Sequence, residues 1–163
     1  MALSADSPPP APLTVSLPPE AGVASLYQEI ILSHYRAPRH KGVIAGATAA
    51  VEHRNPLCGD VMSVQFVHEG GTITDAAFSA RACSITQATA SMLLSRVLGA
   101  TLQEARAVVE QVEQLIESPA VLSDAATVAL GDLRSLASVS RFPARKACVR
   151  LVTGAVLEAI GAQ

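Results

Sequence analysis

The residues best suited to chemistry are three cysteines and an aspartate that stands two positions after the first of them. Cys58, Gly59 and Asp60 follow an Asn-Pro turn, and the glycine lets the backbone bend so that a thiolate and a carboxylate point to one place. Zinc binds thiolate sulfur and carboxylate oxygen in tetrahedral geometry, so this pair is half of a candidate metal site. Cys83 and Cys148 are candidates for the other half. The alternative is a structural turn in which Asp60 caps the backbone and Cys58 is buried.

The other two cysteines fall where helices are expected to begin. Cys83 stands where a strand gives way to a helix, and Cys148 lies near the second turn of the last helix. The partial positive charge of a helix N-terminus favours the thiolate, which is the form that binds metals and attacks electrophiles. Arg145 precedes Cys148 by three residues, so it shares a helix face and could hydrogen-bond a metal-bound sulfur or a neighbouring carboxylate. The alternatives are a solvated basic face or a basic strip that docks an acidic partner.

The four histidines, at positions 34, 40, 53 and 68, show no ligand-like spacing with one another. We interpret His34 and His68 as ordinary half-buried or surface residues, and His53 as a candidate to support a metal ligand. A Cys-His nucleophile pair has no supporting motif around any of the cysteines.

Composition excludes several classes of function. The chain has 163 residues, enough for one ordinary domain, and its longest stretch without charge, at 82–95, is too short to span a membrane. A net charge of −2, five Phe and Tyr residues and no Trp argue against nucleic-acid binding. Three cysteines without a secretory signal indicate a reducing cytoplasm rather than a disulfide framework.

The elements that must position these side chains follow from periodicity and turn residues. Six of the ten prolines lie in 1–24, which predicts a disordered or polyproline-like tail, and 25–163 is the expected domain. An amphipathic helix is expected from 25 to the proline at 38. Alternating segments predict a hairpin and a third strand, and everything after Cys83 is expected to be helical. The expected strands are 48–53, 61–67 and 72–78, and the expected helices are 84–98, 102–117, the less regular 121–139, and 144–160. Strands followed by helices indicate an α+β domain with a small three-stranded antiparallel sheet packed against several helices.

Four motifs, in order, resemble those of the SufU proteins, a branch of the IscU/NifU-like group of iron–sulfur cluster assembly proteins. They are an opening helix with L-Y at 26–27 and H-Y at 34–35, N-P-L-C-G-D at 55–60, C-S-I at 83–85 followed by A-S-M at 90–92, and F-P-A-R-K-A-C at 142–148. The resemblance covers 25 to the C-terminus. Ala82 departs from the family, which usually has glycine before this cysteine.

The resemblance implies an IscU-like fold and a zinc site made by Cys58, Asp60, Cys83 and Cys148. It further implies a zinc-dependent sulfurtransferase that accepts persulfide sulfur from a pyridoxal-phosphate-dependent, SufS-type cysteine desulfurase and passes it to the Suf assembly proteins. In the family a histidine of the partner replaces one cysteine on zinc, and the freed thiolate takes the sulfur. The residue that matches this acceptor is Cys58.

Two features favour the SufU branch over the IscU scaffolds. Ala147 stands where IscU proteins have a histidine, and the long segment 84–147, with L-G-D at 130–132, resembles the SufU insertion. Two alternatives remain open: a scaffold that holds a nascent iron–sulfur cluster, or iron, on the same three cysteines, and a structural zinc module that acts as a binding protein.

Overall fold

The computed structural model describes residues 22–161. Most of the predicted Pro-rich tail, 1–21, therefore lies outside the described residues, as do 162 and 163. The first helix, α1 (Gly22–Arg36), begins three residues before the start expected at 25.

Three strands form one antiparallel sheet in sequence order, as predicted. They are β1 (Ala49–Arg54), β2 (Val61–Glu69) and β3 (Thr72–Arg81). Alternation along β2 sets the core face, because Met62, Val64 and Phe66 are fully buried while the residues between them are half-buried. Glycines in left-handed conformation at 70 and 71 close the β2–β3 hairpin.

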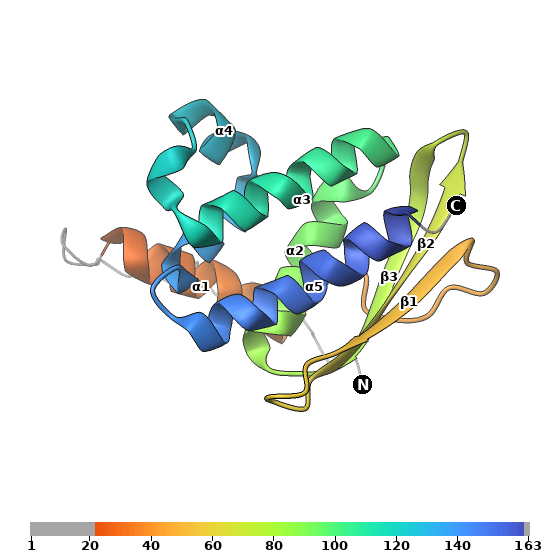
Figure 1. Cartoon of the computed structure of the whole chain (residues 1–163), viewed down its shortest axis with the longest axis horizontal. Coiled ribbons are helices and arrows are strands. Elements are labelled where there is room, and N and C mark those ends of the chain that lie inside the picture. The colour runs from red at the N-terminus through yellow and green to blue at the C-terminus, as the bar shows by residue number, and fades with distance from the viewer. Residues whose placement is uncertain (1–21, 162–163) are drawn as a thin grey trace, which may run out of the picture.

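Two long helices cover the core face of this sheet. The last helix, α5 (Pro143–Gly161), packs against β1 and β2, and α2 (Ser84–Val97) packs against β3 (Figure 1). Both helices are buried along most of their length, which explains their weakly amphipathic sequences. The next helix, α3 (Leu102–Glu117), packs on α5 and begins with a capping box formed by Thr101 and Glu104.

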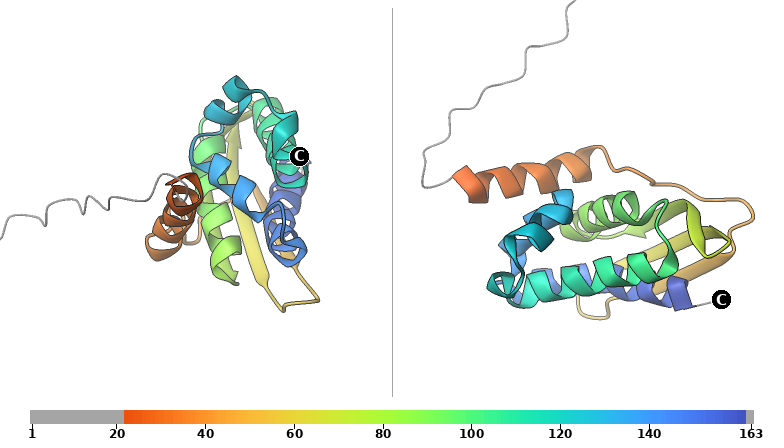
Figure 2. Two further views of the ribbon diagram at one scale, coloured as in Figure 1. Left: turned by 90° about the vertical axis from the view of Figure 1, so that its left-hand side faces the viewer. Right: turned by 90° about the horizontal axis from the view of Figure 1, so that it is seen from above.

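The less regular stretch expected at 121–139 consists of three short helical segments. They are η1 (Pro119–Val121), α4 (Asp124–Ala129) and η2 (Gly131–Val139). Gly131 is left-handed, with φ of 59°, and it separates α4 from η2. Helix α1 packs against α2 and η2, so it forms an outer layer separate from the sheet (Figure 2). Across residues 22–161, no helix combines the length and the apolar character that crossing a membrane requires.

Candidate metal centre

Three segments that are distant in the sequence meet at one end of the sheet. They are the β1–β2 loop, the turn from β3 into α2, and the first turns of α5 (Figure 1). One potential ligand atom from each of Cys58, Asp60 and Cys148 lies within 4.8 Å of the others. Cys83 joins them through Cys148, because the two sulfur atoms are 3.4 Å apart. All four residues singled out in the sequence thus lie in one cluster.

The β1–β2 loop exposes Cys58 and turns Asp60 inward. The Asn55 N–H donates to the Asp60 carbonyl (2.8 Å), and the Gly59 N–H donates back to the Asn55 carbonyl (2.9 Å). Gly59 has a φ of 72°, the left-handed conformation that glycine adopts without strain. Asp60 is consequently 7% exposed whereas Cys58 is exposed. The alternative of a turn with a buried Cys58 is therefore wrong.

Asp60 accepts two hydrogen bonds from the start of α2. The Thr86 hydroxyl donates to Asp60 Oδ2 at 3.0 Å, and the Cys83 N–H donates to the same oxygen at 3.3 Å. Thr86 is fully buried and was not among the predicted site residues. Its position three residues after the cysteine that precedes α2 was the available signal, because that spacing turns a side chain back toward the helix N-terminus.

The sulfur atoms of Cys83 and Cys148 share one partly buried environment. Cys83 is the N-cap of α2, and Cys148 is 8% exposed in α5, as the helix positions predicted. Burial, a hydrogen bond with Cys83 and the charges of Cys83 and Asp60 together raise the pKa of the Cys148 thiol from 9.0 to about 12, and burial contributes most. The Thr86 hydroxyl acts in the opposite direction. When the thiols of Cys83 and Cys148 lose their protons beside the Asp60 carboxylate, the site gathers negative charge. A bound cation would balance that charge.

The donor set fits zinc. Three sulfur atoms and one carboxylate oxygen are the ligand types of a tetrahedral zinc site, and they come from turns and helix starts that the core holds in place. Within residues 22–161, no histidine belongs to the cluster of potential ligands. The residues that would hold the metal are the four predicted ones.

Ala82, the departure from the motif noted in the sequence, does not disturb this arrangement. Among the described residues, His40 is the only non-glycine with a positive φ, so the backbone at Ala82 needs no glycine. The Ala82 carbonyl also accepts a hydrogen bond from the Gln87 side chain at 2.8 Å, which ties the turn to α2.

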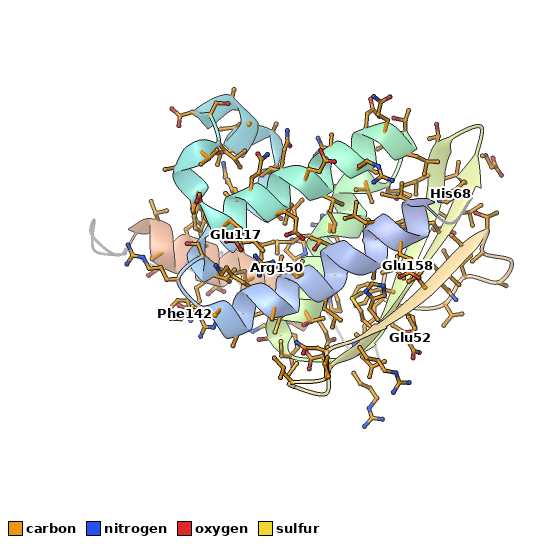
Figure 3. The ribbon with its side chains drawn as sticks, in the orientation of Figure 1. Glu52, His68, Glu117, Phe142, Arg150 and Glu158 are labelled. Carbon is orange, nitrogen blue, oxygen red and sulfur yellow. The ribbon has the colours of Figure 1, made fainter. Side chains whose placement is uncertain are left out.

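Two residues of the predicted basic strip beside Cys148 are paired with carboxylates of α3. The strip comprises Arg134, Arg141, Arg145, Lys146 and Arg150. Lys146 pairs with Glu117, and Arg150 pairs with Glu113 and Glu117. Figure 3 labels Arg150 and Glu117. Arg145 is exposed, and its guanidinium lies 4.6 Å from the centre of the Phe142 ring. In the described part of the chain Arg145 has no hydrogen bond or ion pair with the four cluster residues. A role for Arg145 in supporting a metal ligand stays a prediction.

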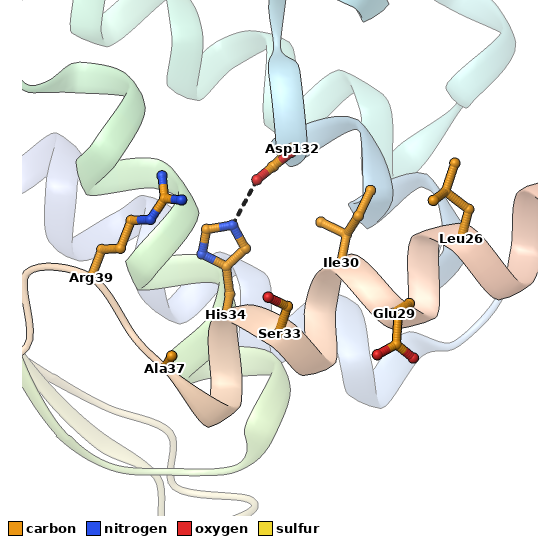
Figure 4. A pocket seen from close by; sticks show the side chains of 8 residues that line it. All are labelled: Leu26, Glu29, Ile30, Ser33, His34, Ala37, Arg39 and Asp132. Atoms are coloured by element: carbon orange, nitrogen blue, oxygen red, sulfur yellow. Dashed lines mark hydrogen bonds and ion pairs between the residues drawn. The ribbon is translucent and has the colours of Figure 1, made fainter. Parts of the chain in front are cut away.

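His34 is buried in a polar network rather than being an ordinary half-buried residue. Its Nδ1 lies 2.8 Å from Ser91 Oγ, and its Nε2 lies 2.8 Å from Asp132 Oδ2, at the rim of a pocket between α1 and η2 (Figure 4). The residue types are those of a Ser-His-Asp triad, but Ser91 is fully buried and cannot meet a substrate. The network instead joins α1, α2 and η2.

His53, a candidate to support a metal ligand, is bonded elsewhere. Its Nε2 contacts the Glu158 carboxylate on α5, and its ring lies against Gly154. Figure 3 labels Glu158 on α5. The contact joins β1 to α5, so His53 links the strand that precedes the Cys58 loop to the helix that carries Cys148.

Comparison with known proteins identifies relatives along most of the chain. Residues 26–149 match the model of the NifU-like N-terminal domain. The chain is 32% identical over 131 residues to the zinc-dependent sulfurtransferase SufU of Bacillus subtilis, covering 80% of this chain and 86% of that protein. It is 33% identical over 135 residues to the iron–sulfur cluster assembly scaffold protein IscU of Streptococcus pyogenes, covering 83% and 82%.

Solved structures share the fold. A NifU-like protein (N-terminal) from Brucella abortus superposes with a TM-score of 0.75 at 25% identity, covering 86% of this chain and 95% of that one. A protein from Fervidobacterium islandicum, described as a candidate scaffold for the SUF system, superposes with a TM-score of 0.74 at 26% identity, covering 83% and 97%.

Proposed function

The chain belongs to the family of NifU-like N-terminal domains, which serve iron–sulfur cluster assembly, and on that premise we propose that it is a zinc-dependent sulfur acceptor. The sulfur donor would be the persulfide of a pyridoxal-phosphate-dependent cysteine desulfurase. The observation that carries the proposal is an exposed Cys58 in one cluster with buried Asp60 and Cys148. A reactive sulfur at the surface is held against fixed, inward-facing ligands.

Cys58 is the acceptor because a large partner can reach it and because, unlike the equally exposed Cys83, its side chain has no hydrogen bond among the described residues. Its thiolate attacks the outer sulfur of the partner's cysteine persulfide, and a new S–S bond forms to Cys58 Sγ. The bond between that outer sulfur and the partner's cysteine breaks, so the partner's thiolate leaves and no external oxidant is needed. Leu57, beside Cys58, is 91% exposed, which keeps the approach open.

The other residues hold the site during this exchange. Asp60, Cys83 and Cys148 would retain the zinc, because the two cysteines lie at the start of α2 and in α5 and the Asp60 carboxylate is hydrogen-bonded to the start of α2. Zinc, when bound, keeps the cysteine sulfurs deprotonated at neutral pH and undergoes no redox change itself. The raised pKa of the Cys148 thiol in the chain alone supports the proposal, because a bound cation would favour the deprotonated sulfur.

Persulfide transfer is tested by mapping the sulfur after a single turnover. The chain is mixed with a cognate cysteine desulfurase and L-cysteine, alkylated, digested and analysed by mass spectrometry. We expect the extra sulfur on the peptide that contains Cys58 and stimulation of desulfurase turnover. Cys58→Ala should abolish both, with Val121→Ala, an exposed substitution far from the loop, as the control. Unchanged stimulation by Cys58→Ala would rule out the acceptor role.

A second candidate function is a scaffold for a nascent iron–sulfur cluster. The similarity to IscU of Streptococcus pyogenes supports it, and the same three cysteines would be the ligands. Ala147 stands directly before Cys148, at the position where the resemblance places a histidine in IscU scaffolds. It supplies no imidazole nitrogen as a ligand, and this counts against the scaffold function. Anaerobic reconstitution with iron and sulfide separates the two functions, because a stable visible chromophore would favour the scaffold.

A further inference from the structure

Thr86 lies between the carboxylate and the sulfur atoms of the metal centre. It is in the first turn of α2 and is fully buried. Its hydroxyl oxygen is 3.0 Å from Asp60 Oδ2 and 3.4 Å from Cys83 Sγ. One buried hydroxyl thus contacts two potential ligands that come from different segments of the chain.

The hydrogen bonds to Asp60 distinguish its two oxygens. Oδ2 receives both the Thr86 hydroxyl and the Cys83 N–H, and within residues 22–161 every hydrogen bond to this side chain reaches that oxygen. A carboxylate oxygen that already accepts two hydrogen bonds has little capacity left for a cation. The other oxygen, Oδ1, is the one available to a metal.

Cys58 differs from the other potential ligands in its hydrogen bonding. Both Cys58 and Cys83 are exposed, but the Cys58 side chain has no hydrogen bond in the part of the chain that the structure describes. Cys83 contacts Thr86 and Cys148, and Cys148 additionally lies 3.4 Å from the Ala144 carbonyl. The four potential ligands therefore comprise three that are held by neighbours and one that is not.

We propose that Thr86 is a positioning residue that makes Asp60 a ligand through one oxygen. Its single hydroxyl proton goes to Asp60 Oδ2, which leaves Oδ1 for the metal and holds the carboxylate at the start of α2, beside Cys83. The inference rests on the proposed zinc centre and deepens it. Thr86 touches neither the metal nor the incoming sulfur in this scheme, and it acts by fixing which oxygen of Asp60 faces the metal.

The test compares two substitutions of Thr86 with one of Thr89. Thr86→Val removes the hydroxyl and keeps the shape, while Thr86→Ser keeps the hydroxyl. Thr89→Val is the matched control, because Thr89 is a fully buried threonine of the same helix whose hydroxyl has no hydrogen-bond partner among the described residues. Zinc affinity is measured by competition with a chromophoric chelator, and circular dichroism checks the fold.

We expect Thr86→Val to weaken zinc binding by about 10- to 100-fold, the usual effect of losing a group that supports a metal ligand. Thr86→Ser and Thr89→Val should stay near the wild-type affinity. Wild-type affinity in Thr86→Val, or no rescue by Thr86→Ser, would overturn the inference.

A measurement on the wild type keeps the inference testable if Thr86→Val fails to fold. X-ray absorption of the zinc-loaded chain should show three sulfurs and one oxygen, and two carboxylate oxygens on zinc would overturn it. The desulfurase assay, run on the same proteins, separates this inference from the proposed function. If Thr86→Val binds zinc weakly and the wild type does not stimulate the desulfurase, the role of Thr86 stands and the proposed sulfur-acceptor function fails. If the wild type stimulates the desulfurase and Thr86→Val binds zinc normally, the proposed function stands and the role of Thr86 fails.

Discussion

The sulfur atoms of Cys83 and Cys148 lie 3.4 Å apart although 65 positions separate the two residues in the chain. One comes from the N-cap of α2 and the other from the second turn of α5, two helices that pack against each other. Their proximity is therefore a property of the core rather than of a flexible loop.

This proximity predicts how the metal-free chain responds to oxidation. A mild thiol oxidant such as diamide should join Cys83 to Cys148, with two electrons and two protons passing to the oxidant. Prior loading with zinc should protect both thiols, because each sulfur is then a metal ligand. Non-reducing peptide mapping measures the pairing, and Cys58→Ser is the control that should leave it unchanged. A disulfide that mainly contains Cys58 would contradict the prediction.

Asp60 is expected to matter for the metal and for the fold. Asp60→Ala removes a ligand, so zinc affinity should fall by at least about 10-fold. It also leaves the buried Thr86 hydroxyl and the Cys83 N–H without their acceptor, which should cost about 1–3 kcal/mol of unfolding free energy in the metal-free chain. Chelator competition and urea unfolding measure the two effects. One tightly held zinc per Asp60→Ala chain would refute the assigned ligand set.

Gly59 and Gly70 provide a matched pair of substitutions. Both are left-handed, with φ of 72° and 59°, and a Cβ would meet nothing at either site. Each glycine-to-alanine change should therefore destabilise the fold by a similar amount, about 1–2 kcal/mol. Only Gly59→Ala should weaken zinc binding, because Gly59 shapes the Cys58 loop whereas Gly70 lies in the hairpin that joins the far ends of β2 and β3. Equal zinc affinities would show that the loop conformation is unimportant.

Arg145 gives a clear choice between two roles. Its observed contact is the Phe142 ring, at 4.6 Å. If Arg145 supports a metal ligand, as predicted from its helical spacing, Arg145→Ala should lower the zinc content of the purified chain. If Arg145 is only a surface residue, Arg145→Ala should leave both the zinc content and the desulfurase stimulation unchanged. Arg141→Ala, an exposed arginine nearby in sequence, is the control.

His68 predicts a pH dependence that is independent of the metal. It lies on β2 beside the Phe66 ring, and burial lowers the pKa of its imidazole from 6.5. The folded chain therefore binds fewer protons at this site than the unfolded chain. Its stability should fall as the pH drops below about 6.5, through the unfolded pKa toward the folded one. His68→Gln should reduce that slope in urea unfolding, and an identical slope would contradict the prediction.

Local patterns in the sequence were enough for most elements and singled out four residues that the structure brings together. Alternation predicted the three strands, and periodicity predicted the helix at 102–117, which begins with a capping box whose hydrogen bonds join residues only three apart. The irregular stretch before α5 was less predictable, since Pro119 and Gly131 interrupt a periodic pattern without specifying where each short helix ends. Lys146 and Arg150 were visible as charges, but their partners on α3 were not.

By itself, the sequence determined that three thiols and a carboxylate sit at turns and helix starts, where such groups are reactive. The tertiary structure alone decided that Cys58 faces outward while Asp60 and Cys148 face inward, because exposure depends on how α2 and α5 pack on the sheet. It also decided that Thr86 reaches Asp60, a contact between residues 26 positions apart. The spacing of residues can suggest a set of ligands. Which of them are exposed and which are held by hydrogen bonds depends on contacts that form only when distant segments share one core.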